Sequence, residues 1–245
     1  MSKLLAEGFR RLFKGVRFYV VLALTVFIPA FVTIFVYIVD GKGSGVGDYM
    51  LFFLTGTMTM FISITAGMFI VNDFKNNTIR NKIIVGHSRA SIYLANLIIS
   101  LFVAIVYQLA YWLTLIGLGK LFDEFRLFPC KEVYTNMLIT MIIIFTFTSA
   151  IVFVCNSMRN VGGFVLSLMM DTIISTVAGM IVMFSRSDKV EKIASIAIPS
   201  LQRDAFRYAP DNVPENAIIM IIIDIAIFIA ATIGGIMVFN RTDLK

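Results

Sequence analysis

Six long apolar runs constrain the fold of this chain more than any other feature of its sequence. Each run lacks charge or carries a single acid, and together they cover residues 18–39, 49–72, 90–119, 133–158, 160–185 and 216–240. Each exceeds the roughly 20 residues that a helix needs to cross about 30 Å of hydrocarbon. Hydrophobic residues make up 59% of the chain and the mean hydropathy is +0.90, so a membrane protein is expected rather than a soluble domain.

The runs show no strand-like alternation of polar and apolar residues. Backbone groups in lipid must find their hydrogen bonds internally, so helices are expected rather than a barrel. The sequence therefore predicts an all-α integral membrane protein with one transmembrane domain over residues 1–245. We expect six transmembrane helices, at about 18–39, 50–71, 93–119, 133–156, 161–184 and 217–239.

The distribution of Lys and Arg predicts the orientation of the chain. The side that would hold both termini has twelve basic residues and three acids, whereas the opposite side has nine basic residues and ten acids. Cytoplasmic loops carry the excess of positive charge in membrane proteins. We therefore expect a multi-pass protein of the plasma membrane with both termini in the cytoplasm.

Residues 3–16 form an amphipathic pattern before the first span. Lys3, Glu7, Arg10, Arg11 and Lys14 fall largely opposite a face of six apolar residues, namely Leu4, Leu5, Phe9, Leu12, Phe13 and Val16. This pattern predicts a helix lying in the inner headgroup layer. A solvated basic tail is the alternative.

Several motifs of catalysis and binding are missing from the sequence. It has no Walker-type phosphate loop, no HExxH, no paired cysteine ligands and a single histidine. No basic cluster is interleaved with aromatic residues, which argues against a nucleic-acid partner. We expect no catalysis, no metal site and no bound cofactor in this chain.

Two acids lie inside predicted spans, Asp171 in the fifth and Asp224 in the sixth. A charge at the centre of a bilayer costs about 2.5–3.5 kcal/mol on insertion scales, so such residues usually face protein or water. No Lys or Arg lies within any predicted span to pair with them. Asp171 is therefore expected to be protonated or to face a wet cavity.

Small and polar residues form stripes on three predicted spans. The fifth span carries Gly163, Ser167, Asp171, Ser175 and Gly179 at intervals of four. The second carries Gly56, Thr59, Ser63 and Gly67, and the first carries Thr25, Pro29 and Thr33. Small residues let helices approach closely in lipid, so helix packing is one interpretation. The other is that these faces, together with Asp224, line a transport route or meet across a subunit interface.

The segment that joins the second and third spans is long and basic. Residues 72–92 read NDFKNNTIRNKIIVGHSRASI. With its neighbouring spans it resembles the permease subunit of bacterial type 2 ATP-binding-cassette exporters, a family that includes peptide and toxin exporters. Asp73 stands where the family more usually has Glu, and Asn77-Thr78 stands for Gly-Thr. The Gly86-His-Ser-Arg89 turn and the start of the next helix at Ile92 fit the family pattern well.

The resemblance implies that this segment is a cytoplasmic coupling helix that docks on a separate ATPase subunit. Phe74, Ile79, Ile83 and Ile84 would supply apolar contacts, and Lys75, Arg80, Lys82 and Arg89 complementary charge. The remaining members of the implied coupling set are Asp73, Thr78, Gly86, His87 and Ser88. A loop anchored at the headgroups by its basic residues is the alternative.

The resemblance also implies the partners of the chain. Two ATPase subunits would bind ATP and Mg, and a second permease copy would complete the route, with a homodimer preferred over a heterodimer. The cargo would be an amphipathic peptide or lipid-like molecule, and Asp171 would suit a cationic amphipathic helix. Two other functions stay open: a proton-coupled secondary carrier centred on Asp171, and a non-transporting membrane immunity or scaffold protein.

Overall fold

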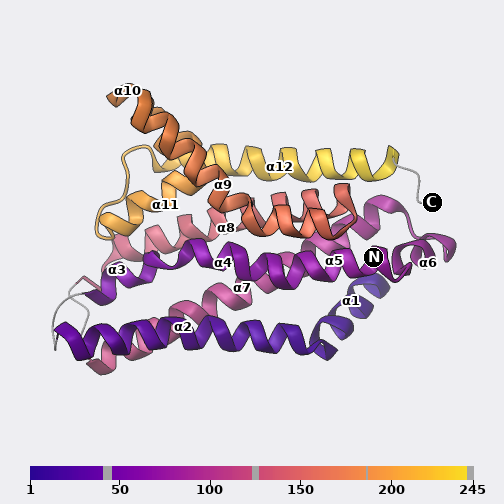
Figure 1. Cartoon of the computed structure of the whole chain (residues 1–245), viewed down its shortest axis with the longest axis horizontal. Coiled ribbons are helices and arrows are strands. Elements are labelled where there is room, and N and C mark those ends of the chain that lie inside the picture. Colours follow the sequence, from indigo (N-terminus) through magenta and orange to yellow (C-terminus); the bar gives the residue numbers. More distant parts are fainter. Residues whose placement is uncertain (41–45, 123–126, 186, 242–245) are drawn as a thin grey trace.

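The computed structural model describes residues 1–40, 46–122, 127–185 and 187–241 of the chain (Figure 1). The secondary structure of these residues is helical, without strands. By length and composition, six of the helical segments can cross a membrane: Val16–Val39, Gly47–Lys75, Arg89–Phe122, Lys131–Met158, Val161–Ser185 and Ala217–Arg241. The predicted all-α class, with six helices long and apolar enough to span a membrane, is therefore confirmed.

The helices follow one another along the chain with short connections. Their bounds are α1 (Ser2–Lys14), α2 (Val16–Asp40), α3 (Val46–Phe53), α4 (Thr55–Ile62), η1 (Ser63–Gly67), α5 (Met68–Lys75), α6 (Thr78–Ile84), α7 (Arg89–Phe122), α8 (Lys131–Met158), α9 (Val161–Ser185), α10 (Asp188–Ala197), α11 (Pro199–Tyr208) and α12 (Ala217–Arg241). Figure 1 shows α1, α6 and the last turn of α12 at one end of the bundle, which we call the α6 end. The opposite end holds α3 and α11 and is called the α11 end.

The spans differ in how much of their surface the chain itself buries. In α8 and in the second span, 61% of the most apolar window is buried, against 11% in α9 and 17% in α12. The core therefore lies between α7, α8 and the second span. Apolar side chains on α2, α9 and α12 point outward, as expected for helices that face hydrocarbon or another membrane subunit.

The second span is interrupted, unlike the single regular helix expected at 50–71. The break between α3 and α4 is bridged by Tyr111, whose hydroxyl donates to the Met50 carbonyl and accepts from the Leu54 N–H at 3.3 Å. Further along, Ser63–Gly67 forms a turn of π-helix, in which Ser63 Oγ donates to the Ser167 carbonyl at 2.9 Å. Wide turns of this kind divert a helix, here toward α9.

Helix α1 is amphipathic, but the chain itself covers part of its apolar face. Leu4 and Leu12 are buried, and the Phe9 ring meets Phe102 of α7 edge-on with centroids 5.0 Å apart. Phe13 remains 43% exposed. The headgroup position of this helix stays a prediction, whereas its packing against α7 is a feature of the fold.

The segment between the fifth and sixth spans folds back onto the bundle, except that Arg186 lies outside the described residues. It contains two consecutive helices, α10 and α11. Helix α11 contacts α3, α8, α9 and α12. Its Phe206 is fully buried and lies 6.2 Å from Phe52 between ring centroids. This packing brings the charged residues of α11 beside the membrane-spanning helices.

Candidate functional site

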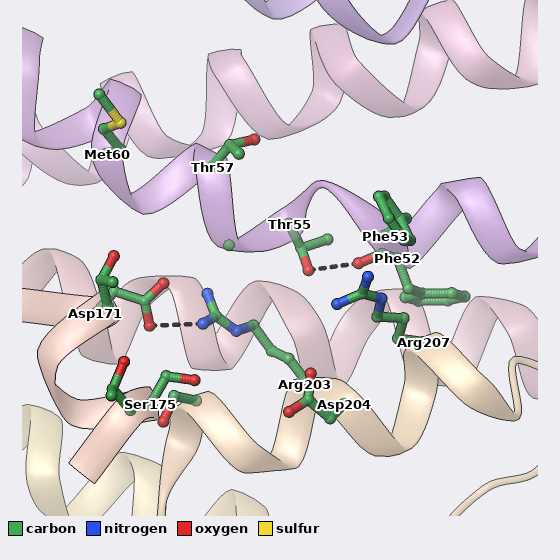
Figure 2. Close-up of a pocket in the computed structure, with 14 residues that line it drawn as sticks. Phe52, Phe53, Thr55, Thr57, Met60, Asp171, Ser175, Arg203, Asp204 and Arg207 are labelled. Carbon is green, nitrogen blue, oxygen red and sulfur yellow. Dashed lines mark hydrogen bonds and ion pairs between the residues drawn. The ribbon is translucent and has the colours of Figure 1, made fainter. Parts of the chain in front are cut away.

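Asp171 of α9 has a basic partner in α11. Arg203 Nη2 donates to Asp171 Oδ1 at 2.6 Å (Figure 2). Thr59 Oγ1 of α4 donates to Asp171 Oδ2 at 3.1 Å. The Arg203 residue is 7% exposed. Among the described residues, no Lys or Arg within a span pairs with Asp171; its partner comes from α11, a helix outside the six spans that folds back against them.

A cavity of about 350 Å³ surrounds this ion pair, bounded by α3, α4, α9 and α11 (Figure 2). Its lining includes the aromatic residue Phe53, the thioether of Met60 and the hydroxyl groups of Thr172 and Thr176. All four of these residues are exposed, so the cavity reaches the outer surface of the chain. We call it the α11 cavity.

Two more ionisable residues of α11 line the cavity. The Arg207 guanidinium lies 3.9 Å from the centroid of the Phe53 ring. Burial raises the pKa of Asp204 above its ordinary value, while the charges of Arg203 and Arg207 oppose that shift. Together with Asp171, the α11 cavity contains two guanidinium groups and two carboxyl groups.

The cavity also contains hydrogen-bonding atoms without partners among the described residues. Arg203 Nη1 and Ser200 Oγ are both buried and neither forms a hydrogen bond. The Ser200 residue is 1% exposed. Buried polar atoms nearly always have a partner in folded proteins, so these two stand out.

The stripes of the second and fifth spans meet within the chain. A Cβ on Gly56 would lie 3.6 Å from Asp171 Oδ2, and one on Gly67 would lie 3.3 Å from Ser167 Oγ. The contacts of Thr59 with Asp171 and of Ser63 with Ser167 complete the seam. Within one chain, these stripes therefore allow the second span and α9 to pack closely. A subunit interface built from them stays a prediction.

The ends of the fifth-span stripe lie apart from this seam. Gly163 packs against Met158, at the turn between α8 and α9. Ser175 lines the α11 cavity, whereas nothing lies within 4 Å of a Cβ built on Gly179.

The first-span stripe does not join the cavity. Thr25, Pro29 and Thr33 are buried, and α2 packs mainly against α7. Thr25 Oγ1 donates to the Leu22 carbonyl one turn earlier at 2.7 Å. None of the three lines the α11 cavity.

Asp224, the second intramembrane acid, is also reached by α11. Its side chain is fully buried, and the side-chain amide of Gln202 faces it. Neither Asp224 carboxyl oxygen has a hydrogen bond among the described residues. Adjacent residues of α11, Gln202 and Arg203, thus meet acids on two different spans. Sequence reasoning missed both, although two long polar residues after Pro199 were the available signal.

At the α6 end, a buried carboxylate holds three segments together. Asp73 of α5 is 2% exposed and accepts hydrogen bonds from both terminal nitrogens of Arg11 in α1, with Nη2 at 2.8 Å. Lys82 Nζ of α6 donates to Asp73 Oδ2 at 3.0 Å. Burial alone would lower the pKa of Arg11, but the hydrogen bonds and charge of Asp73 outweigh it and raise the pKa.

This network divides the predicted coupling residues into two groups. Ile79 and Lys82 are buried, which corrects their expected role as contacts with a partner, and Asp73 faces inward with them. The exposed group comprises Lys75, Arg80, Ile84, Gly86 and Ser88, while Thr78, Ile83 and His87 are half-buried. Ile84 is 73% exposed and its neighbour Val85, which the sequence reasoning omitted, is 77% exposed.

Two further predicted coupling residues contact α12 instead of facing outward. The Phe74 ring meets Phe239 edge-on with centroids 6.0 Å apart. Arg89 Nη1 donates to the carbonyls of Phe239 and Asn240, at 3.3 and 3.0 Å. These residues tie the start of α7 and the end of α5 to the last turn of α12.

Left-handed backbone conformations mark both ends of α6. Asn77 has φ 55° before the helix, and Gly86 has φ 96° after it. Glycine adopts this region freely and asparagine tolerates it better than most residues. The two positions set α6 as a short arm between α5 and α7.

No family model matches the chain, and searches of curated proteins and solved structures gave no match. Among the described residues, no group of three or more His, Cys, Asp or Glu side chains could hold a metal ion.

Proposed function

We propose that this chain is the transmembrane subunit of an ATP-binding-cassette exporter in the plasma membrane, with both termini cytoplasmic. It moves an amphipathic peptide or lipid-like substrate out of the cytoplasm by alternating access. Helix α6 is the coupling helix, and a separate ATPase subunit supplies ATP and Mg. The chain itself carries out no catalysis.

The observation that carries the proposal is the exposed tip of α6. Two adjacent branched apolar residues, Ile84 and Val85, are each more than 70% exposed. The basic side chains of Arg80 in α6 and of Lys75 at the end of α5 are exposed too. Exposed apolar patches rimmed by polar residues mark protein or membrane interaction sites. A cleft in a partner protein, with acidic residues at its rim, fits this surface.

The base of α6 supports the same function. Lys82 joins α6 to α5 through Asp73, and Arg11 joins the same carboxylate to α1. Buried, hydrogen-bonded charge pairs resist separation, because removing one partner leaves the other uncompensated. A push on the tip of α6 would therefore move α1 and the second span together, as coupling to ATP hydrolysis requires.

The backbone of Asn77 supports the family resemblance. The family pattern has Gly at this place, and Asn77 adopts a left-handed conformation that glycine takes without strain. Asparagine is one of the few other residues that tolerate it, so the substitution keeps the turn.

A second copy of the chain completes the proposed exporter. Thr172 and Thr176 are exposed on α9 at the mouth of the α11 cavity. Hydroxyl groups at membrane depth usually face protein or water rather than lipid. A homodimer would cover these residues and enclose a route between two α9 helices.

Co-purification with an ATPase encoded by neighbouring genes tests the proposal. The variants Arg80→Glu and Ile84→Asp should lose ATPase binding and stimulated ATP hydrolysis while keeping their unfolding temperature, because both side chains are exposed. Lys14→Glu, an exposed charge reversal on α1, is the matched control and should keep both. Intact coupling in Arg80→Glu and Ile84→Asp would contradict the proposal.

A proton-coupled carrier is the second candidate function, and Asp224 is the observation that favours it. This acid is buried within a span and its carboxyl oxygens lack hydrogen bonds among the described residues. Asp171, on which such a carrier was first centred, is paired with Arg203. Transport by the purified chain in liposomes under a pH gradient, without ATPase, would favour this candidate over the exporter.

A further inference from the structure

The α11 cavity has hydrogen-bond donors with nothing to bind. Arg203 Nη1 and the Ser200 hydroxyl are buried and without partners among the described residues, and both residues line the cavity. A buried donor without a partner is unfavourable, and more so when it is charged. A ligand that accepts hydrogen bonds would remove this cost.

One of the two carboxyl groups in the cavity, that of Asp171, is already engaged. Asp171 Oδ1 accepts from Arg203 Nη2, and Oδ2 accepts from Thr59 Oγ1. A cationic ligand would have to displace Arg203 to reach this carboxylate. An anionic ligand needs no such displacement, because Arg203 Nη1 remains available beside the ion pair.

The mouth of the cavity is apolar on one side. Phe53 and Met60 line it and are 41% and 42% exposed. The volume of about 350 Å³ falls at the small end of the range for small-molecule sites, enough for a headgroup and the first part of a chain. The tail of an amphipathic ligand would leave along these two side chains.

We propose that the α11 cavity binds the acidic group, phosphate or carboxylate, of an amphipathic molecule. Arg203 Nη1 and Ser200 Oγ donate to that group, while Asp171 holds the guanidinium in place. This ligand class differs from the cationic peptide that Asp171 alone suggested. That this ligand is the exported cargo rests on the proposed function, whereas the binding of the ligand to the α11 cavity does not.

The test is equilibrium binding of tritiated dodecyl phosphate to the purified full-length chain in dodecyl maltoside micelles, without ATPase. Charge-assisted hydrogen bonds contribute about 1.5–3 kcal/mol, so Arg203→Gln should weaken binding about tenfold or more. Ser200→Ala should weaken it several-fold. Lys189→Gln, an exposed charge removal on α10, is the matched control and should leave binding unchanged.

Asp171→Asn should tighten binding, because Arg203 then lacks its internal counter-charge. The double variant Asp171→Asn with Arg203→Gln removes both charges of the buried pair, so it should fold and still fail to bind. Dodecyl phosphate binding that is unchanged in this double variant and in Ser200→Ala would overturn the proposal. So would stronger displacement by dodecyltrimethylammonium than by dodecanoate.

Competitors separate the sources of the acidic group. If phosphatidylglycerol competes best, the site binds lipid headgroups. If dodecanoate or dodecyl phosphate competes best, the site binds single-chain amphiphiles. Inorganic phosphate competing equally well would overturn the amphipathic part of the proposal. Loss of ATPase coupling in Ile84→Asp leaves this binding unaffected, so the two proposals fail independently.

Discussion

Arg203 of α11 lies 2.6 Å from the carboxylate of Asp171 in α9, so a helix outside the spans neutralises an acid inside one. The side chains of both residues are largely buried, at 8% and 14% exposed. The pair fixes α11 against α9 and α4. The same contact positions the guanidinium group in the α11 cavity.

Removal of either partner of this pair should destabilise the fold. Breaking a buried ion pair from one side costs about 3–5 kcal/mol, because the remaining charge is left uncompensated. Asp171→Asn and Arg203→Gln should each lower the unfolding temperature, and the double variant should lose less than the sum. Thermal unfolding in detergent, analysed as a double-mutant cycle, measures this coupling. Additive effects would show that the pair does not interact.

The Asp73 network at the α6 end leads to a second prediction. Asp73→Asn leaves Lys82 buried without a counter-charge, so we expect a loss of about 3–5 kcal/mol. Adding Lys82→Met should recover part of that loss, since it removes the buried cation. Lys75→Gln, an exposed neighbour in α5, should change stability by less than about 0.5 kcal/mol. Denaturant titration of the parent chain, the two single variants and the double variant measures these free energies of unfolding. If Asp73→Asn alone lost as little stability as Lys75→Gln, the prediction would be contradicted.

Two adjacent glycines of α12 should respond oppositely to alanine. A Cβ on Gly235 would collide with the ring and hydroxyl of Tyr93, which is fully buried and cannot move aside. We expect Gly235→Ala to cost about 1–3 kcal/mol through overpacking. A Cβ on Gly234 meets Phe153 at an ordinary 3.8 Å, so Gly234→Ala should be neutral or stabilising. Unfolding temperatures of the two variants decide this, and equal values would contradict the packing at Tyr93.

Asp204 predicts a pH dependence of stability. Burial raises its folded pKa above the ordinary value of 3.8, so the folded state holds the proton more tightly than the unfolded chain does. The resulting stabilisation is complete below about pH 3.8 and is lost as the pH rises through the folded pKa. Asp204→Asn should therefore be less sensitive to pH in this range than the parent chain. Unfolding temperatures measured from pH 3.5 upward test this, and parallel curves would contradict it.

The membrane class and the number of spans could be predicted from the sequence because both depend on local composition. A run of 20 apolar residues is costly to expose to water wherever it lies in the chain. The four-residue spacing of Ser63, Gly67, Ser167 and Asp171 also indicated which faces pack closely. Local periodicity assigns a residue to a face, but it does not name the helix that the face meets.

The candidate sites depended on contacts between distant residues. Arg203 is 32 positions from Asp171, and Arg11 is 62 positions from Asp73. Sequence reasoning placed Lys82 on the docking surface because its helix is basic, yet Lys82 is buried in an ion pair with Asp73 of α5, which Arg11 of α1 also contacts. Sequence reasoning also omitted Val85, because the exposure of a side chain depends on which residues the fold places beside it.

The sequence by itself determined that this chain has six helices long and apolar enough to cross a membrane, because transfer of apolar side chains from water is additive along each run. Tertiary structure decided which polar residues are paired and which face outward. The energy of a charge depends on groups within a few ångströms, and folding alone brings α11 to Asp171 and α1 to Asp73. After these pairs have formed, the unpartnered donors of the α11 cavity and the exposed tip of α6 remain available to bind other molecules.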